Sequence, residues 1–324
     1  MLKETKNSLS AQSVCIANGR HPFHWEKLGK IISPSKAIPW LATCTGSAFA
    51  CQVDESSVWD LYVTGRDEQN RSQIGRIRID LLNPTTVLEI SEESVISLGE
   101  LGAFDENGVA YPSLVKDQER VYLYYVGWMP TVLTPFQNHL GLAKQSSDGR
   151  FYRVSKAPIL ERTHEDYLGT GSAYVMIENG CWRMWYTAFH RWEKKADGLK
   201  HWYRIKYAES QDGLHWERKG VCIDFAHEKE FAICRPTVVK LENLYHMWYC
   251  YRGEQYRIGY AVSLDGLHWE RRDTEVGLTV SREGWDSAAL CYPHVFYYGN
   301  KLYMLYCGND YGKAGLGIAC AVVR

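Results

Sequence analysis

The segment YAVSLDGLHWER (residues 260–271) decides the fold, because the chain repeats it almost letter for letter as YAESQDGLHWER (residues 207–218). A related copy, FHWEKLGKII (residues 23–32), stands near the start of the chain, far from the other two. The copies are rich in aromatic residues, and the two later ones carry an Asp-Gly turn, a pattern typical of strands joined by hairpins. The chain is therefore predicted to be assembled from repeated β units.

Two further segments recur with a similar spacing. A short aromatic segment returns at intervals of 57 to 63 residues, beginning at Leu61, Leu123, Met184, Met247 and Met304. Each copy is preceded by a segment centred near Ser47, Pro112, Ser172, Pro236 or Pro293. Four strands in a unit of about 60 residues, named A (innermost), B, C and D, are typical of one propeller blade with long loops.

These repeats predict an all-β fold: a single five-bladed β-propeller over residues 21–324, preceded by an N-terminal extension of residues 1–20. The fifth unit ends at its C strand, in LGIACAVVR, so residues 23–32 are predicted to supply its D strand. This arrangement closes the ring and covers an edge that would otherwise invite aggregation. Two β-sandwich domains with similar turns are the alternative, and the regular spacing favours the propeller. The Asp-Gly turns are interpreted as structural hairpins.

Composition argues for a globular protein with a substantial core, since 45% of the residues are hydrophobic and 13% aromatic. The formal net charge of −1 gives no reason to expect nucleic acid or an anionic membrane as a partner. The start of the chain lacks an apolar signal segment, which predicts a cytoplasmic protein. The ten cysteines are irregularly spaced without a CxxC pair, so we expect reduced thiols, no metal site and no cofactor. The oligomeric state stays open.

Alternating strand direction places the starts of strands A and C and the ends of strands B at one end of the ring. The segments before strand A carry the candidate catalytic residues, because the carboxyl groups in them can act as general acid or base. These candidates are Asp105, Asp286, Glu165 and Asp166. Turn capping is an equally open interpretation of Asp105 and Asp286, and loop solvation is an interpretation of Glu165 and Asp166.

The loops between strands B and C, together with two positions in strand A, mix cationic, polar and aromatic residues. Aromatic faces suit the C–H surfaces of sugars, and Arg or Asn side chains suit hydroxyl, phosphate or carboxylate groups. The candidate binding residues are Arg66, Asp67, Trp128, His190, Arg191, Arg235, Arg252, His294, Asn309 and Tyr311. His294 could equally point into the packing between blades.

On these segments the chain resembles the five-bladed propeller superfamily of furanosidases, invertases, arabinanases and mannoside phosphorylases. The resemblance runs from Phe23 to the C-terminus and rests on the five A and B segments and on residues 207–218 and 260–271. Hydrolases of that superfamily carry catalytic carboxylates on innermost strands. This chain departs from the pattern, with ATCTGSA (residues 42–48) in the first blade and CRPTVV (residues 234–239) without the Arg-Asp-Pro of invertases. The family nucleophile is therefore carried over to no residue.

Two functions follow from the resemblance. In the first, the protein is a carbohydrate-active enzyme with a rearranged carboxylate site, which hydrolyses, phosphorolyses or transfers a glycosyl group of a small sugar-containing or oligosaccharide substrate in the central funnel. A phosphorylase needs only one protein carboxylate, because phosphate is its nucleophile. In the second, the propeller has lost glycosidase chemistry and binds a glycan or metabolite, or catalyses a different biosynthetic step.

Overall fold

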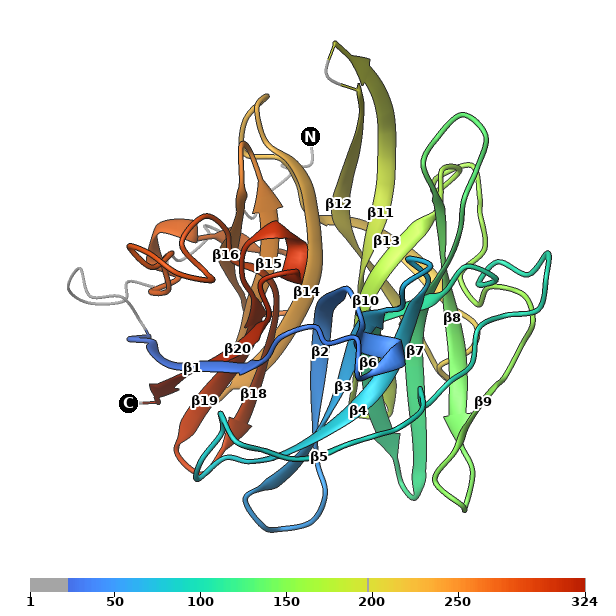
Figure 1. The fold of residues 1–324 in the computed structure, drawn as a ribbon. Coiled ribbons are helices and arrows are strands. Elements are labelled where there is room, and N and C mark those ends of the chain that lie inside the picture. Colours follow the sequence, from blue (N-terminus) through green and yellow to red (C-terminus); the bar gives the residue numbers. More distant parts are fainter. Residues whose placement is uncertain (1–22, 197, 324) are drawn as a thin grey trace, which may run out of the picture.

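Five antiparallel sheets of four strands each form a closed ring in the structure, a computed structural model that describes residues 23–196 and 198–323. The innermost strands contact one another in sequence around the circle, and the last of them, β18, contacts the first, β2. This arrangement confirms the predicted all-β, five-bladed propeller (Figure 1).

The blades follow one another along the chain. Blade one contains β2 (Cys44–Gln52), β3 (Val58–Arg66), β4 (Ser72–Asp80) and β5 (Val87–Ile90). Blade two contains β6 (Val109–Asp117), β7 (Arg120–Met129), β8 (Gln137–Gln145) and β9 (Phe151–Arg153). Blade three contains β10 (Thr170–Glu178), β11 (Cys181–Lys195), β12 (Gly198–Ser210) and β13 (Glu217–Ile223). Blade four contains β14 (Phe231–Leu241), β15 (Leu244–Arg252), β16 (Tyr256–Ser263) and β17 (Glu270–Arg271).

Blade five combines the two ends of the chain, as the sequence predicts. Its strands are β18 (Cys291–Tyr298), β19 (Lys301–Cys307), β20 (Leu316–Val322) and, outermost, β1 (Glu26–Ile32). β1 pairs antiparallel with β20, with Glu26 opposite Cys320 and Ile32 opposite Leu316. The predicted extension, residues 1–20, lies outside the described residues.

Three short 3-10 turns complete the described part: η1 (Pro39–Leu41), η2 (Asp273–Glu275) and η3 (Asp310–Gly312). A helix with the length and apolar composition needed to cross a bilayer does not occur among the residues described.

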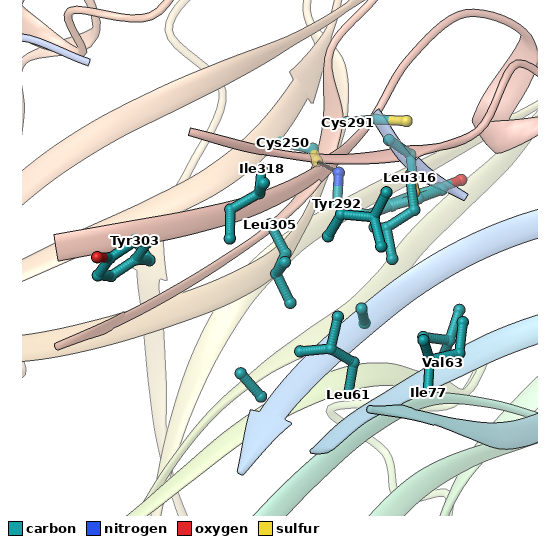
Figure 2. Close-up of a cluster of buried hydrophobic side chains, with 14 of the residues drawn as sticks. Leu61, Val63, Ile77, Cys250, Cys291, Tyr292, Tyr303, Leu305, Leu316 and Ile318 are labelled. Carbon is teal, nitrogen blue, oxygen red and sulfur yellow. Dashed lines mark hydrogen bonds between the residues drawn. The ribbon is translucent and has the colours of Figure 1, made fainter. Parts of the chain in front are cut away.

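Apolar side chains fill the space between neighbouring sheets. Between blades one and five, Leu61 and Ile77 face Leu305 and Ile318, and each of the four is fully buried (Figure 2). Consecutive side chains along a strand point to opposite faces of its sheet, and in β19 and β20 both sets are buried. The core is therefore a series of contacts between blades rather than a single central cluster.

The Asp-Gly turns also join blades. Tyr124 of blade two donates its hydroxyl to the Gly213 carbonyl in blade three at 2.7 Å, and Trp185 of blade three donates Nε1 to the Gly266 carbonyl in blade four at 2.8 Å. Gly213 and Gly266 have φ of +73° and +75°, a region that favours glycine. These contacts support the interpretation of the turns as structural hairpins.

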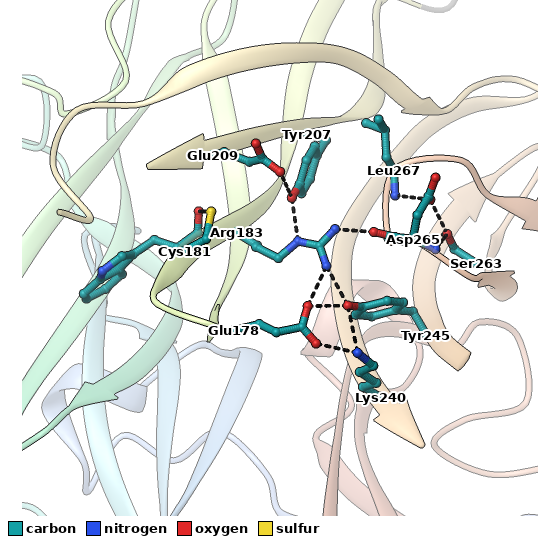
Figure 3. A network of polar contacts seen from close by, with 12 residues as sticks. Glu178, Cys181, Arg183, Tyr207, Glu209, Lys240, Tyr245, Ser263, Asp265 and Leu267 are labelled. Carbon is teal, nitrogen blue, oxygen red and sulfur yellow. Dashed lines mark hydrogen bonds and ion pairs between the residues drawn. The ribbon is translucent and has the colours of Figure 1, made fainter. Parts of the chain in front are cut away.

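A buried arginine connects blades three and four at the end of the ring where the Asp-Gly turns lie. Arg183 donates to the Tyr207 hydroxyl at 2.6 Å, to the Tyr245 hydroxyl at 2.7 Å and to the Asp265 carbonyl (Figure 3). Glu178 accepts from Arg183 at 2.9 Å and from Lys240 at 2.6 Å. Burial acts to raise the pKa of Glu178, but the hydrogen bonds from Lys240, Tyr245 and Arg183 outweigh it and lower the pKa to about 2.

Because of this network, the free energy of unfolding depends on pH in the acidic range. Because the folded pKa of Glu178 lies below the unfolded value, its contribution is complete above about pH 4.5 and is lost as pH falls toward 2. We expect Glu178→Gln to lower the free energy of unfolding by about 3 kcal/mol at pH 7 and by much less at pH 2.5. Urea unfolding of both proteins across that range measures the difference, and a constant difference would contradict the expectation.

Candidate functional site

A cavity of about 480 Å³ opens at the end of the ring where the A and C strands begin. We call it the mouth pocket. Residues of all five blades line it: Thr43, Cys44, Gly46, Ser47, Thr64, Arg66, Asn70, Ala110, Tyr111, Val126, Trp128, Pro135, Phe136, Asn138, His201, Tyr203, Tyr256, Tyr292, Asp310, Tyr311 and Lys313. A pocket built by every blade at the ring axis has the position that ligands take in closed β architectures.

Tyrosines dominate the wall of the mouth pocket. Burial raises the pKa values of Tyr111, Tyr203, Tyr256 and Tyr292, so their hydroxyl groups remain protonated at neutral pH. The rings of Tyr111 and Tyr292 meet edge to face with centroids 5.4 Å apart. The pocket therefore offers several neutral hydroxyl groups on rigid aromatic rings, a combination that suits sugar hydroxyls.

The long hairpin of β11 and β12 contributes the side wall, and it extends beyond the rest of the ring (Figure 1). His201 of this hairpin stacks on Tyr203 with centroids 4.8 Å apart and contacts Phe136 of blade two at 5.8 Å. Burial, together with the nearby Arg252, lowers the pKa of His201 to about 4, so the imidazole is neutral at pH 7.

Charged side chains occupy one side of the rim. Arg66 lies over the Trp128 ring at 5.1 Å, and Trp128 is fixed in turn by a 2.6 Å hydrogen bond from its Nε1 to Ser72 Oγ. Asp310 and Lys313 line the rim from blade five. Among the residues that the structure describes, Asp310 is the one carboxylate in the lining of the mouth pocket.

The floor is formed by strained backbone at the start of the A strands. Tyr111 and Tyr292 have φ of +54° and +58°, although each is a large residue that precedes proline. Such backbone costs about 1 to 3 kcal/mol and needs support from its surroundings. The amide of Tyr111 donates to Thr64 Oγ1 at 2.9 Å, and that of Tyr292 lies 2.7 Å from Cys250 Sγ. Both tyrosines line the mouth pocket.

Three predicted catalytic carboxylates lie buried outside the mouth pocket. Asp105, Asp166 and Asp286 stand just before strands β6, β10 and β18. Each accepts a hydrogen bond from a tyrosine 20 residues further along: Tyr125 at 3.0 Å, Tyr186 at 2.8 Å and Tyr306 at 3.1 Å.

Each of these three carboxylates also forms an ion pair with a D strand: with Arg153 at 2.7 Å, Arg218 at 2.8 Å and Lys27 at 2.6 Å. We call this arrangement a carboxylate latch, because it ties the loop before strand A to strands B and D.

The carboxylate latch explains the repeated HWER segment. Its last residue, Arg218 or Arg271, or Lys27 in the N-terminal copy, is the cation of the latch. In blade four Arg271 pairs with Glu230 and Asp273 at 2.7 and 2.6 Å. Blade one has no carboxylate before its A strand, and there Trp40 donates Nε1 to the Ser91 carbonyl at 2.9 Å.

The latch also sets the charge of its members. Burial acts to raise the pKa of Asp286, but hydrogen bonds from Lys27, Ser281 and Tyr306 outweigh it and lower the pKa. Glu165, the fourth predicted catalytic residue, is exposed, with His164 Nε2 3.9 Å away. The catalytic roles of Asp105, Asp166, Asp286 and Glu165 remain predictions.

Several of the predicted binding residues lie at or near the mouth pocket. Arg66, Trp128 and Tyr311 line it. Arg252 lies behind Tyr311, with its guanidinium 5.4 Å from that ring. Arg235 and His294 are buried, on β14 and β18, at the centre of the ring below the floor.

The other four predicted binding residues do not line the mouth pocket. Asp67 pairs with Arg71 at 2.8 Å and borders a separate cavity of about 530 Å³. His190 contacts Arg204 at 2.7 Å, and Arg191 lies over the Trp202 ring at 4.2 Å. Asn309 accepts from the backbone amides of residues 288 and 289. Their binding roles remain predictions.

Sequence reasoning missed most of the tyrosine wall. Tyr111 and Tyr292 directly precede the prolines of two A segments, and Tyr203 and Tyr256 stand near or at the start of two C strands. Both locations belong to the predicted site end of the ring. A search that included aromatic residues at strand starts, rather than charged loop residues alone, could have found them.

A group of three or more His, Cys, Asp or Glu side chains arranged to hold a metal ion is absent from the described residues. In the described lining of the mouth pocket, Asp310, His201 and Cys44 are the residues of these types, and they do not form such a group. What the pocket offers chemically is neutral hydroxyls, aromatic faces, two cations and one carboxylate.

Solved structures share the fold at low sequence identity. A glycoside hydrolase matches with a TM-score of 0.72 at 16% identity, over 94% of this chain and 92% of its own. A structure from work on the GH130 family of mannoside phosphorylases matches with a TM-score of 0.69 at 14% identity, over 95% of each chain. A thermostable family-43 glycoside hydrolase gives 0.67 at 19% identity, over 86% of this chain and 89% of its own.

Sequence comparison identifies nearer relatives. No family model matches the chain. The uncharacterized proteins MT1551 and Rv1502, from two strains of Mycobacterium tuberculosis, are each 37% identical over 299 residues, which is 91% of this chain and 98% of theirs. The protein therefore belongs to the family of these mycobacterial proteins, and its fold is that of the five-bladed propeller glycoside hydrolases.

Proposed function

We propose that the protein is a carbohydrate-active enzyme that binds a small sugar-containing substrate in the mouth pocket. The observation that carries this proposal is the composition of the pocket wall, where neutral tyrosine hydroxyls and a fixed indole surround a space of about 480 Å³. A monosaccharide or disaccharide presents the matching mixture of C–H faces and hydroxyl groups. The fold shared with glycoside hydrolases supports the same substrate class.

The single carboxylate of the pocket favours glycosyl transfer to a co-substrate, such as phosphorolysis. Hydrolysis by paired carboxyl groups requires two of them at about 5 to 10 Å from each other, one on each side of the scissile bond. Asp310 can serve as the acid that protonates the leaving oxygen, while Arg66 and Lys313 hold an anionic nucleophile. In this reaction the attacking oxygen comes from the co-substrate and not from the protein.

Sugar binding without chemistry is the second candidate. It is favoured by the exposure of Asp310, because an exposed side chain is not held beside the scissile bond by surrounding groups. The nine cysteines that the structure describes are all free, and five of them are buried. This supports the cytoplasmic setting proposed for either candidate.

A substrate screen separates the two candidates. Wild type is assayed on disaccharides and aryl glycosides with and without phosphate, beside Asp310→Asn and Asp105→Asn. We expect phosphate-dependent turnover that falls by about 10²-fold or more in Asp310→Asn. The control, Asp105→Asn, is expected to lose stability while its folded fraction retains turnover.

The alternative outcomes are informative. Sugar binding by calorimetry without turnover of any substrate would support the second candidate. Turnover that survives in Asp310→Asn and disappears in a folded Asp105→Asn would instead assign the acid to the carboxylate latch.

A further inference from the structure

Arg235 is a buried cation without a counter-charge among the described residues. It is 1% exposed and enters the ring centre from β14, the innermost strand of blade four. Its Nη2 donates to the carbonyl oxygens of Ala48 in blade one and Pro112 in blade two, both at 2.9 Å. The guanidinium therefore spans the ring axis, one residue along each strand from the pocket-lining residues Ser47 and Tyr111.

The remaining donors of Arg235 have no acceptor. Nε and Nη1 are both buried and make no hydrogen bond to the described residues. These two nitrogens carry three hydrogens that water or an anion would normally satisfy. Leaving a buried donor of a charged group unsatisfied is strongly unfavourable, so these donors are expected to have a partner beyond the described residues.

The surroundings of Arg235 are neutral. None of the ion pairs among the described residues includes it, and the titratable groups that act on it are the hydroxyl of Tyr111 and the thiols of Cys234, Cys250 and Cys307. Burial lowers the pKa of Arg235 to about 10 and raises those of Tyr111, Cys250 and Cys307, so at neutral pH the arginine is charged while these neighbours are not.

A second orphaned polar atom lies in the same part of the ring. His294, on β18, is 2% exposed, and its Nε2 has no hydrogen-bond partner. Its ring stacks on Phe49 of blade one, with centroids 4.1 Å apart. Burial and the charge of Arg235 lower the pKa of His294, which keeps it neutral and able to donate one N–H.

We propose that the ring centre holds a small anion against Nε and Nη1 of Arg235, directly below the floor of the mouth pocket. The anion supplies the counter-charge that the blades lack, and it holds in place the guanidinium that joins β14 to β2 and β6. Its chemistry is that of a halide, a phosphate or a carboxylate. It is either a free ion or the anionic group of a ligand that reaches through the floor. The proposal does not depend on turnover of a sugar.

Ion-dependent stability tests the proposal. Protein dialysed into a buffer of bulky organic ions is titrated with bromide, chloride, phosphate, a sugar phosphate and a uronic acid at constant ionic strength. Wild type is expected to gain about 5 °C in Tm when an anion that fits reaches 100 times its Kd. Arg235→Met should lose this gain, whereas Arg150→Met, which removes an exposed arginine on a C–D turn, should keep it.

The pattern across the anions identifies the source. A gain with inorganic anions indicates a free ion, and a gain restricted to the sugar phosphate or the uronic acid indicates the anionic group of a ligand. Absence of any gain in wild type, or an equal gain in Arg235→Met, would overturn the proposal.

A second measurement covers the case in which Arg235→Met does not fold. Crystals of wild type soaked in bromide should show an anomalous peak beside Nε or Nη1 of Arg235. If both inorganic and ligand anions leave that position empty, the proposal is wrong. Because neither experiment measures glycoside turnover, failure here leaves the proposed function standing, and failure of the substrate screen leaves the anion site standing.

Discussion

Removal of residues 1–32 is expected to abolish folding of the whole protein, although the segment belongs to one blade. β1 provides every D-strand hydrogen bond of blade five, and its loss exposes the edge of β20. It also removes Lys27, whose ammonium group is the only ion-pair partner of the buried Asp286 in the described residues. An unpaired buried carboxylate alone costs about 3 to 5 kcal/mol.

The segment just before β1 adds apolar contacts with a second blade. Phe23 is 4% exposed and packs on Trp248 and Tyr260 of blade four, with ring centroids 5.3 and 6.0 Å apart. Burying one such aromatic ring contributes about 2 to 3 kcal/mol. Together with the latch and the strand pairing, this loss approaches the whole stability of a typical domain, about 5 to 15 kcal/mol.

A matched truncation controls for the change in length. A protein that begins at Phe23 keeps every contact described here and should unfold at the same temperature as the full chain. The measurement is size-exclusion chromatography and thermal unfolding of both truncations. A monodisperse, cooperatively unfolding protein without residues 1–32 would show that the ring closes in another way.

Asp166→Asn is expected to lower the free energy of unfolding by about 3 to 5 kcal/mol. Asp166 is fully buried and pairs with Lys206 at 2.7 Å and Arg218 at 2.8 Å. Both cations are themselves more than four-fifths buried, and the amide would leave them without a counter-charge. The neighbouring Glu165→Gln removes an exposed charge and should change stability by less than about 0.5 kcal/mol.

Urea unfolding of the two variants decides between a structural and a catalytic role for this carboxylate. The structural role predicts a lower midpoint for Asp166→Asn with an unchanged slope. An unchanged midpoint combined with a loss of sugar turnover would support the catalytic prediction for Asp166.

The fold was predictable because its information is local and repeated. Each A and B segment and each Asp-Gly turn is a short pattern, and five copies fix the number of blades. The D strands were less predictable. The D strand of blade four is only the two-residue β17, after which η2 turns Asp273 toward Arg271. An outermost strand pairs on one side only, so its length depends on side-chain contacts rather than on strand pattern.

The candidate site was less predictable because its decisive contacts are not local. The local sequence around an acidic residue before strand A does not show whether its side chain lines a pocket or forms a carboxylate latch. For Asp105 the outcome depends on Arg153, 48 residues away, and for Arg235 on carbonyl groups 123 and 187 residues away. The repeat did contain a signal, since a basic residue ends each HWER or HWEK copy, but its partner is visible only in the folded ring.

The pairing of β1 with β20 also governs the order of folding. During synthesis the ribosome releases β1 before the strands of the other four blades and β20 after them, so blade five stays incomplete until all of these strands have emerged. Until then β1 is unpaired, and the ring is open with exposed strand edges. The contacts that close it join residues far apart in the sequence, and such contacts form slowly. Ring closure therefore has to wait for β20, and the interval before it is when the chain most needs protection from aggregation.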